Sequence, residues 1–197
     1  MTDTKERPII LKDYEVRAVL SGAKTQTRMV LKRAPLGRIA PGKTGDRLWV
    51  KETFSETDRE DGTPVVAYRA GGCIAVGRES ESSPDRLIHA YSWPDTPSVE
   101  RWQPATRMPR WASRTTLEVT GVRAERLQAI TEADARAEGI TDGGCLCCGN
   151  PEPCGCMTPM PDSRDSFAEL WLSIHGAGSW HANPWIWVIE FRMINAS

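Results

Sequence analysis

Two long segments with the residue pattern of β-strands constrain the fold of this chain more than any other feature. The first, from Arg114 to Leu127, alternates apolar and polar residues, and the second, WIWVIEFR from Trp185 to Arg192, is mostly apolar. Alternation with a period of two is typical of a strand that buries one face, and Gly121 predicts a bulge or bend inside the first strand. A strongly curved, mainly antiparallel sheet is therefore expected.

Shorter periodic segments accompany these two strands. Further strands are predicted over residues 8–11, 27–31, 47–54 and 65–69. Helices are predicted from Asp13 to Leu20, from the Thr131 capping box to Gly139, and from Asp162 or Ser163 onward, where Phe167, Leu170, Trp171 and Ile174 form one apolar stripe. The mixture indicates an α+β fold, with a curved sheet or small β-barrel flanked by short helices.

Two stretches interrupt this pattern. Residues 71–109 are rich in Gly, Ser, Pro and Asp, which is typical of a functional loop or an ordered insertion. A cysteine-rich stretch covers residues 141–161. Because a length of 197 residues suits one domain, we predict a single domain over residues 1–197 that carries these two insertions.

The composition is that of an ordinary globular protein, with 40% hydrophobic and 26% charged residues, so wholesale disorder is not expected. No apolar run approaches the ~18 residues that a membrane-spanning helix needs. The first residues, MTDTKERPIILK, have neither the apolar segment nor the cleavage site of a secretory signal. We therefore expect a cytoplasmic protein with no membrane partner, and the sequence identifies no protein partner.

Charge is unevenly distributed along the chain, although the net charge is only −1. Residues 1–55 carry a net charge of +6 and residues 101–130 one of +4, whereas residues 56–100 and 131–197 carry −5 and −6. Near-neutrality argues against a protein coated in basic surface. The two basic blocks would form a bounded anion-attracting cleft if they converge, and the alternative is a mixed, solvated surface.

Five of the six cysteines lie between Cys145 and Cys156. Thiols stay reduced in the cytosol, which favours a metal knuckle over disulfides. Cys145 and Cys148 have C-x₂-C spacing and Cys154 and Cys156 have C-x-C spacing, so these four thiolates are the predicted ligands of a structural Zn²⁺. Unligated thiols or redox chemistry are the alternatives. A closed thiolate shell leaves no position for a catalytic water, and no organic cofactor is predicted.

The segment GAKTQTR, from Gly22 to Arg28, concentrates reactive side chains directly after a predicted helix. A lysine in a partly dry cleft can act as a general base, so Lys24 could activate Thr27 as a nucleophile. Arg28 could hold a phosphate or an oxyanion. A solvated turn is the other interpretation of the same residues, and the segment alone leaves both open.

The pattern G-x-K-x-x-T-R, formed by Gly22, Lys24, Thr27 and Arg28, resembles the signature of the ASCH domain family, relatives of the PUA RNA-binding fold. Four further segments resemble phage and prophage members of that family: GDRLWV at 45–50, MPRWASR at 108–114, ERLQ at 125–128 and NPWIWV at 183–188. The resemblance covers most of the chain apart from residues 71–100 and the cysteine-rich stretch. It implies a PUA-like, small curved β-barrel.

The resemblance also implies an activity. Small bacterial members of the family resemble amidohydrolases of N4-acetylcytidine, in which a Lys and a Thr of the signature act with a Glu on a later helix. Lys24 and Thr27 match the first two positions, and Glu138 in ARAEG falls where the third is expected. Lys24 would accept the Thr27 proton, Thr27 would attack the exocyclic amide, and Glu138 would orient Lys24 or carry a proton to the leaving amine.

Two other functions fit the same residues. An RNA-binding module would hold phosphates with Lys24, Arg28, Arg110 and Arg114 and would offer Trp111 for base stacking. A metal-independent ribonuclease would use Lys24 and Thr27. The partner is then single-stranded RNA rather than a nucleoside, and the fold alone does not decide between these functions.

Overall fold

A computed structural model of the chain describes residues 4–31, 42–76, 92–140 and 163–194. The strands of this part form two sheets, with the order β1-β3-β8-β9-β2 in one and β4-β5-β6-β7 in the other. The contacts divide the chain into two compact units. The first unit consists of Met1–Leu20, Arg47–Glu118 and Met193–Ser197, and the second unit consists of Ser21–Asp46 and Val119–Arg192.

The α+β prediction is confirmed, but the barrel prediction is corrected. Among the described residues the five-stranded sheet is open, because β1 and β2 are its two edges, and the other strands form a separate sheet. The single strand predicted over residues 47–54 is two strands, β3 (Arg47–Lys51) and β4 (Phe54–Asp58), which belong to different sheets. The break lies at Glu52, a fully buried carboxylate that pairs with Arg114.

Three α-helices lie in the described ranges, close to their predicted positions. Helix α1 (Asp13–Leu20) has the predicted bounds. Helix α2 (Glu132–Ala137) begins at the predicted capping box of Thr131 and Asp134, and α3 (Ser163–His175) buries Phe167 and Trp171 of the predicted stripe. None of the helices in this part of the chain is long and apolar enough to cross a membrane.

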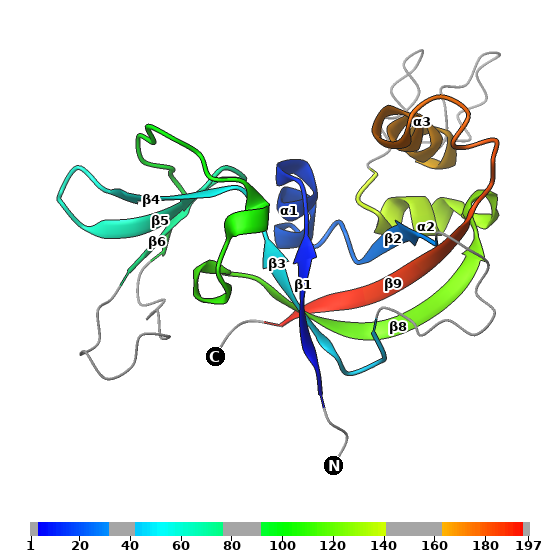
Figure 1. Cartoon of the computed structure of the whole chain (residues 1–197), viewed down its shortest axis with the longest axis horizontal. Coiled ribbons are helices and arrows are strands. Elements are labelled where there is room, and N and C mark those ends of the chain that lie inside the picture. The colour runs from blue at the N-terminus through cyan, green and yellow to red at the C-terminus, as the bar shows by residue number, and fades with distance from the viewer. Residues whose placement is uncertain (1–3, 32–41, 77–91, 141–162, 195–197) are drawn as a thin grey trace. The chain divides into compact units, whose positions relative to one another are not determined.

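The first unit contains the four-stranded sheet, whose strands lie side by side in Figure 1. Its strands are β4, β5 (Pro64–Tyr68), β6 (Cys73–Ala75) and β7 (Ser92–Trp93), all antiparallel. The apolar run of β5 is buried on both faces: Val65 and Ala67 pack with Cys73, whereas Val66 and Tyr68 pack in the cluster of Phe54. A strand buried on both faces needs covering layers on each side.

Both covering layers come from the stretch predicted to be irregular, residues 71–109, and from the residues just after it. Trp93, Val99 and Trp102 pack against one face of the sheet. Met108, Trp111 and Ala112, around the short 3₁₀ turns η1 (Ala105–Arg107) and η2 (Arg110–Ala112), pack against the other. The described part of this stretch is therefore an ordered cover. Strands as short as β6 and β7 have too few residues to show a periodicity. Their positions depend on their partners, since β6 pairs with β5 and β7 pairs with β6.

The remaining strands of the first unit belong to the five-stranded sheet. Strand β1 (Glu6–Ile10) pairs in parallel with β3, and β3 pairs antiparallel with the beginning of β8 (Thr116–Arg126). In the second unit, β2 (Gln26–Val30) pairs antiparallel with β9 (Trp185–Ile194). The two long strands predicted over residues 114–127 and 185–192 are thus β8 and β9.

The core of the second unit joins both of its helices to the sheet. After β8 the chain passes through the turn η3 (Leu127–Ala129) into α2. The buried cluster combines side chains from η3, α2, α3 and β9: Leu127, Ile130, Ala135, Phe167, Trp171, Ile186 and Val188. Because Val188 lies opposite Arg28 of β2, the same face of β2 points toward these helices.

Candidate functional site

Three polar side chains on alternate residues, Lys24, Gln26 and Arg28, are buried at the N-terminal end of β2. They are 4%, 3% and 9% exposed. Residues two apart along an extended chain share one face, and Lys24 already pairs with Glu138 as an isolated antiparallel bridge. Gly22, with φ of 78°, supplies the left-handed turn that precedes this segment.

This face is joined to the C-terminal end of α2. The Thr25 N–H donates to the carbonyl of Ala137 at 2.8 Å, and Gln26 Nε2 donates to the carbonyl of Asp134 at 2.9 Å. Lys24 Nζ donates to the carbonyl of Glu138 at 3.2 Å. The last carbonyls of a helix lack partners within the helix and attract cations. The end of α2 is therefore a natural seat for the Lys24 ammonium.

The Glu138 carboxylate lies between two cations of the β2 segment. Its Oε2 is 2.7 Å from Lys24 Nζ, and its Oε1 is 2.8 Å from Arg28 Nη1. The three side chains are only 3%, 5% and 1% exposed for Lys24, Glu138 and Arg28. A carboxylate with both oxygens bonded to buried cations has a fixed orientation.

Arg28 extends this cluster to two further carboxylates. Its Nη2 is 3.0 Å from Glu125 Oε1 and 3.7 Å from Asp134 Oδ2. Its guanidinium lies 5.5 Å from the ring centre of Phe167. Nε is buried and has no hydrogen-bond partner in the described part of the chain. Arg28 is thus enclosed by carboxylates and an aromatic ring, and we call these side chains with Lys24 the Arg28 cluster.

A second arginine, Arg123 of β8, supports the same carboxylates from a more exposed position. It bonds Glu125 at 3.1 Å and Asp134 at 2.7 Å, and it also pairs with Glu190 of β9. Burial acts to raise the pKa of Asp134, but the hydroxyl and N–H of Thr131 and the charges of Arg28 and Arg123 outweigh it, and that pKa is lowered. Asp134 is therefore held in its charged form by these partners.

Thr27 lies beside this cluster but not on its face. It pairs with Ile189 of β9 and is 7% exposed. Because successive side chains of a strand point to opposite faces, the Thr27 side chain points away from the side that Gln26 and Arg28 share. The structure therefore brings Lys24, Arg28 and Glu138 into contact and places Thr27 on the other face of β2. The role of Thr27 as a nucleophile stays a prediction.

The other predicted binding residues belong to the first unit. Arg110 is exposed, bonds both carboxylate oxygens of Glu6 at 2.8 and 3.1 Å and lies 5.7 Å from the ring centre of Trp49. Trp111 is half-buried against the cluster of Phe54 and Tyr68. Trp111 thus anchors the cover of the four-stranded sheet.

Arg114 forms a buried ion pair. Its Nε and Nη2 donate to the two oxygens of Glu52 at 2.9 and 2.8 Å, its Nη1 donates to the carbonyl of Gly71, and its guanidinium lies 4.0 Å from the ring centre of Tyr68. Burial raises the pKa of Glu52 despite the opposing effect of Arg114. Every terminal nitrogen of Arg114 already has a partner, and the arrangement is that of a structural pair.

Sequence reasoning missed Gln26, Arg123, Glu125 and Asp134. A signal existed for two of them, because Arg123 and Glu125 are two residues apart in an alternating strand and so share one face. The four predicted zinc ligands, Cys145, Cys148, Cys154 and Cys156, lie outside the described residues. Within the described ranges, no group of three or more His, Cys, Asp or Glu side chains is placed to hold a metal ion.

Comparison with known proteins finds similarity only at the level of solved structures. No family model and no curated protein matches the chain. The chain is similar to an ASCH domain from Lactobacillus crispatus JV V101, with a TM-score of 0.44, 10% identity, and coverage of 98% of this chain and 81% of that one. It is also similar to a DUF984 protein from Enterococcus faecalis V583, with a TM-score of 0.40, 9% identity, and coverage of 99% and 83%.

Proposed function

We propose that this protein is a hydrolase that removes the acyl group from N4-acylated cytidine or a related acylated pyrimidine nucleoside. The observation that carries the proposal is the buried contact of 2.7 Å between Lys24 Nζ and Glu138 Oε2, two residues 114 positions apart in the chain. The resemblance of the signature around Lys24 to the ASCH family supplies the substrate class.

The pair has the chemistry that proton transfer requires. An ammonium cannot accept a proton, so Lys24 first passes one to Glu138, whose Oε2 is within hydrogen-bond distance. The resulting amine can then act as a general base. Arg28 holds the other carboxylate oxygen at 2.8 Å, which keeps Oε2 directed at Lys24. Arg28 is therefore a positioning residue in this proposal.

The reaction balances most simply with water as the nucleophile, because Thr27 lies on the other face of β2 from Lys24. Water attacks the acyl carbon while one of its protons passes to the Lys24 amine, the bond from the acyl carbon to N4 breaks, and N4 takes a proton from the pair and leaves as cytidine. The acyl group is released as the carboxylic acid. The alternative is attack by the Thr27 oxygen to form an ester that water then hydrolyses, and it requires the Thr27 hydroxyl to reach the substrate from the other face of the strand.

The geometry favours this function over an RNA-binding module built from the predicted arginines. The Arg28 side chain is 1% exposed and bonds two carboxylates, and the Arg114 side chain is 12% exposed and bonds both oxygens of Glu52. Phosphate contacts need guanidinium N–H groups that can reach the ligand. To bind a phosphate, Arg114 would have to leave the buried Glu52, and Arg28 would have to leave the buried Glu138 with Lys24 as its remaining cation; both changes are costly.

The proposal is tested by incubating the purified full chain with N4-acetylcytidine and measuring cytidine release by chromatography. Lys24→Ala and Glu138→Gln should each lower kcat/KM by about 10²–10⁴-fold, the usual contribution of a general acid or base. Lys43→Ala and Glu169→Gln are the matched controls, because both side chains are exposed in the same unit, and each should keep the wild-type rate. No cytidine release by the wild type would overturn the proposal.

The nucleophile is tested separately. If Thr27 is the nucleophile, Thr27→Ser retains activity, Thr27→Val loses it, and rapid quenching reveals an acetyl adduct on Thr27 by mass spectrometry. Activity retained in Thr27→Val would assign the attack to water and refute the Thr27 role alone. A labelled single-stranded RNA serves as a second substrate, and its cleavage without any cytidine release would favour the ribonuclease interpretation instead.

A further inference from the structure

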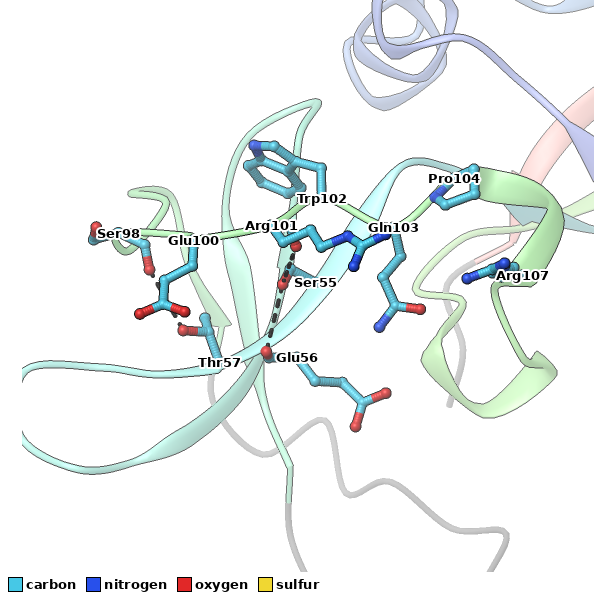
Figure 2. A pocket seen from close by; sticks show the side chains of 10 residues that line it. All are labelled: Ser55, Glu56, Thr57, Ser98, Glu100, Arg101, Trp102, Gln103, Pro104 and Arg107. Atoms are coloured by element: carbon cyan, nitrogen blue, oxygen red, sulfur yellow. Dashed lines mark hydrogen bonds between the residues drawn. The ribbon is translucent and has the colours of Figure 1, made fainter.

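The first unit contains a second candidate site, independent of the proposed hydrolase site. A groove with a volume of about 700 Å³ runs between β4 and the segment Ser98–Arg107, and Figure 2 shows the side chains that line it. This volume lies within the range of about 300–1,000 Å³ that is usual for small-ligand sites. All of its lining residues belong to the first unit.

The walls of this groove are held in place without a ligand. Phe54 and Gln103 exchange two backbone hydrogen bonds, of 3.2 and 2.8 Å. The hydroxyl of Ser55 donates to the carbonyl of Arg101 at 3.0 Å. Trp102 packs in the cluster of Val65, Ala67 and Cys73, and Figure 2 shows its indole turned away from the side chain of Gln103. The segment is therefore pinned to β4 and pre-organised.

The charged and amide side chains that line the groove are the groups available to a ligand. In the part of the chain that the structure describes, no side-chain hydrogen bond or ion pair joins Arg101, Gln103, Arg107, Glu56 or Glu100 to another residue. Other arginines of the same unit do have carboxylate partners: Arg59 with Asp95, Arg69 with Asp13, Arg110 with Glu6, and Arg114 with Glu52. Two guanidiniums and two carboxylates thus face one groove without neutralising each other.

The positions of these charged and amide groups along the groove indicate which kind of ligand would bind there. Figure 2 shows Gln103 and Arg107 toward one end of the groove and Ser98 and Glu100 toward the other. Guanidinium and amide N–H groups bind phosphate oxygens, and Arg does so in a bidentate manner. Carboxylates repel a phosphate but accept hydrogen bonds from sugar hydroxyls and base amino groups. A ligand that satisfies both ends carries a phosphate and several hydrogen-bond donors.

We propose that this groove binds a nucleotide unit, with its phosphate on Arg107 and Arg101 and its sugar or base on Glu100. The ligand chemistry is the same for a free nucleoside monophosphate and for one nucleotide of a single-stranded chain. The proposal does not depend on the hydrolase activity, because the groove and the Arg28 cluster share no residue.

The test is calorimetric titration of the full chain with cytidine 5′-monophosphate, cytidine and inorganic phosphate. The monophosphate should bind at least tenfold more tightly than either fragment, with an affinity that falls as salt is added. Arg107→Ala and Arg101→Ala should each weaken the binding of the monophosphate at least tenfold. Glu100→Gln should weaken the binding of the monophosphate. The same variant should bind inorganic phosphate as tightly as the wild type or more tightly, because a repelling charge is removed.

Two controls locate the site. Arg17→Ala removes an exposed arginine of α1 that does not line the groove, and Lys24→Ala disables the proposed hydrolase site; both should bind like the wild type. Binding that disappears in Lys24→Ala, or that survives in the double variant Arg101→Ala/Arg107→Ala, would overturn the proposal. Equal affinity for inorganic phosphate and the monophosphate would reduce the groove to an anion site and would also overturn it.

A hexanucleotide RNA distinguishes the two sources of the ligand. If it binds at least tenfold more tightly than the monophosphate and still requires Arg107, the occupant is a nucleotide within a chain. If the two bind equally and both require Arg107, the occupant is a free nucleotide. Both results support the proposed chemistry.

Discussion

Replacing Arg28 by methionine tests whether the Arg28 cluster holds the second unit together. Methionine keeps an unbranched apolar side chain but removes the guanidinium that bonds Glu138 at 2.8 Å and Glu125 at 3.0 Å. Glu138 would retain only Lys24 as its cation, at a side-chain exposure of 5%. Two carboxylates would thus lose their shared partner in a place that water hardly reaches.

The magnitude follows from the number and burial of these bonds. Hydrogen bonds to charged groups contribute about 1.5–3 kcal/mol each, and breaking a buried ion pair by removing one partner costs about 3–5 kcal/mol. Because Lys24 and Arg123 still compensate part of the negative charge, we expect a loss of about 3 kcal/mol in the free energy of unfolding. With a urea m-value of about 2 kcal/mol/M, the midpoint should fall by about 1.5 M.

The assay is urea unfolding followed by far-UV circular dichroism and tryptophan fluorescence. Arg164→Met is the matched control, because the Arg164 side chain is exposed in the same unit and donates to the carbonyl of Gln128, while its backbone N–H keeps its bond to Glu132 in the variant. This change should alter the free energy of unfolding by about 0.5 kcal/mol or less. The double variant Arg28→Met/Glu138→Gln should lose less than the sum of the single changes, because both changes break the same Arg28–Glu138 bond. A loss below about 1 kcal/mol in Arg28→Met would refute the reasoning.

Three further predictions concern other parts of the molecule. The pKa of Asp134 is lowered in the folded state. Its charged form therefore stabilises the fold at neutral pH, and this contribution is lost as the pH falls through the lowered folded-state pKa. In thermal melts below about pH 4, Asp134→Asn should show a smaller decline in stability than the wild type. Gly72→Ala should destabilise the protein by about 1–3 kcal/mol, because φ is 82° and a Cβ would lie 2.8 Å from the Trp93 carbonyl; Gly62→Ala, with φ of 80° and open space, should cost less in the same urea titration. Metal analysis of protein purified without chelator should find about one zinc per chain, and Cys148→Ser should lower that content; a zinc-free wild type would contradict the predicted knuckle.

Regular elements with strong local patterns could be predicted from the sequence. The bounds of α1 were predictable from a cap and apolar spacing, and α3 from the stripe that includes Phe167 and Trp171. Strand β8 was predictable from its alternation, and β9 from its run of aromatic and β-branched residues. In all four cases the signal lies within one continuous segment.

Elements that depend on distant partners were not predictable. The strand predicted over residues 47–54 divides at Glu52 because that carboxylate pairs with Arg114, 62 residues away. Strands β6 and β7 lie in a stretch that looks irregular, since their pairing is decided by β5 and by one another. The open strand order, in place of a barrel, follows from the entry of β4 to β7 into a separate sheet.

For the candidate site too, the sequence identified residues, whereas their contacts depended on the tertiary structure. The sequence by itself identified Lys24, Arg28 and Glu138 as chemically notable, through a motif and a family resemblance, and it predicted that Arg28 would hold a phosphate or an oxyanion. Only the tertiary structure decided that the Arg28 guanidinium is occupied by Glu138 and Glu125, 110 and 97 residues away. Residue types and short spacings are local properties of a chain, whereas the partner of a charged group depends on which distant segments the fold brings within hydrogen-bond distance.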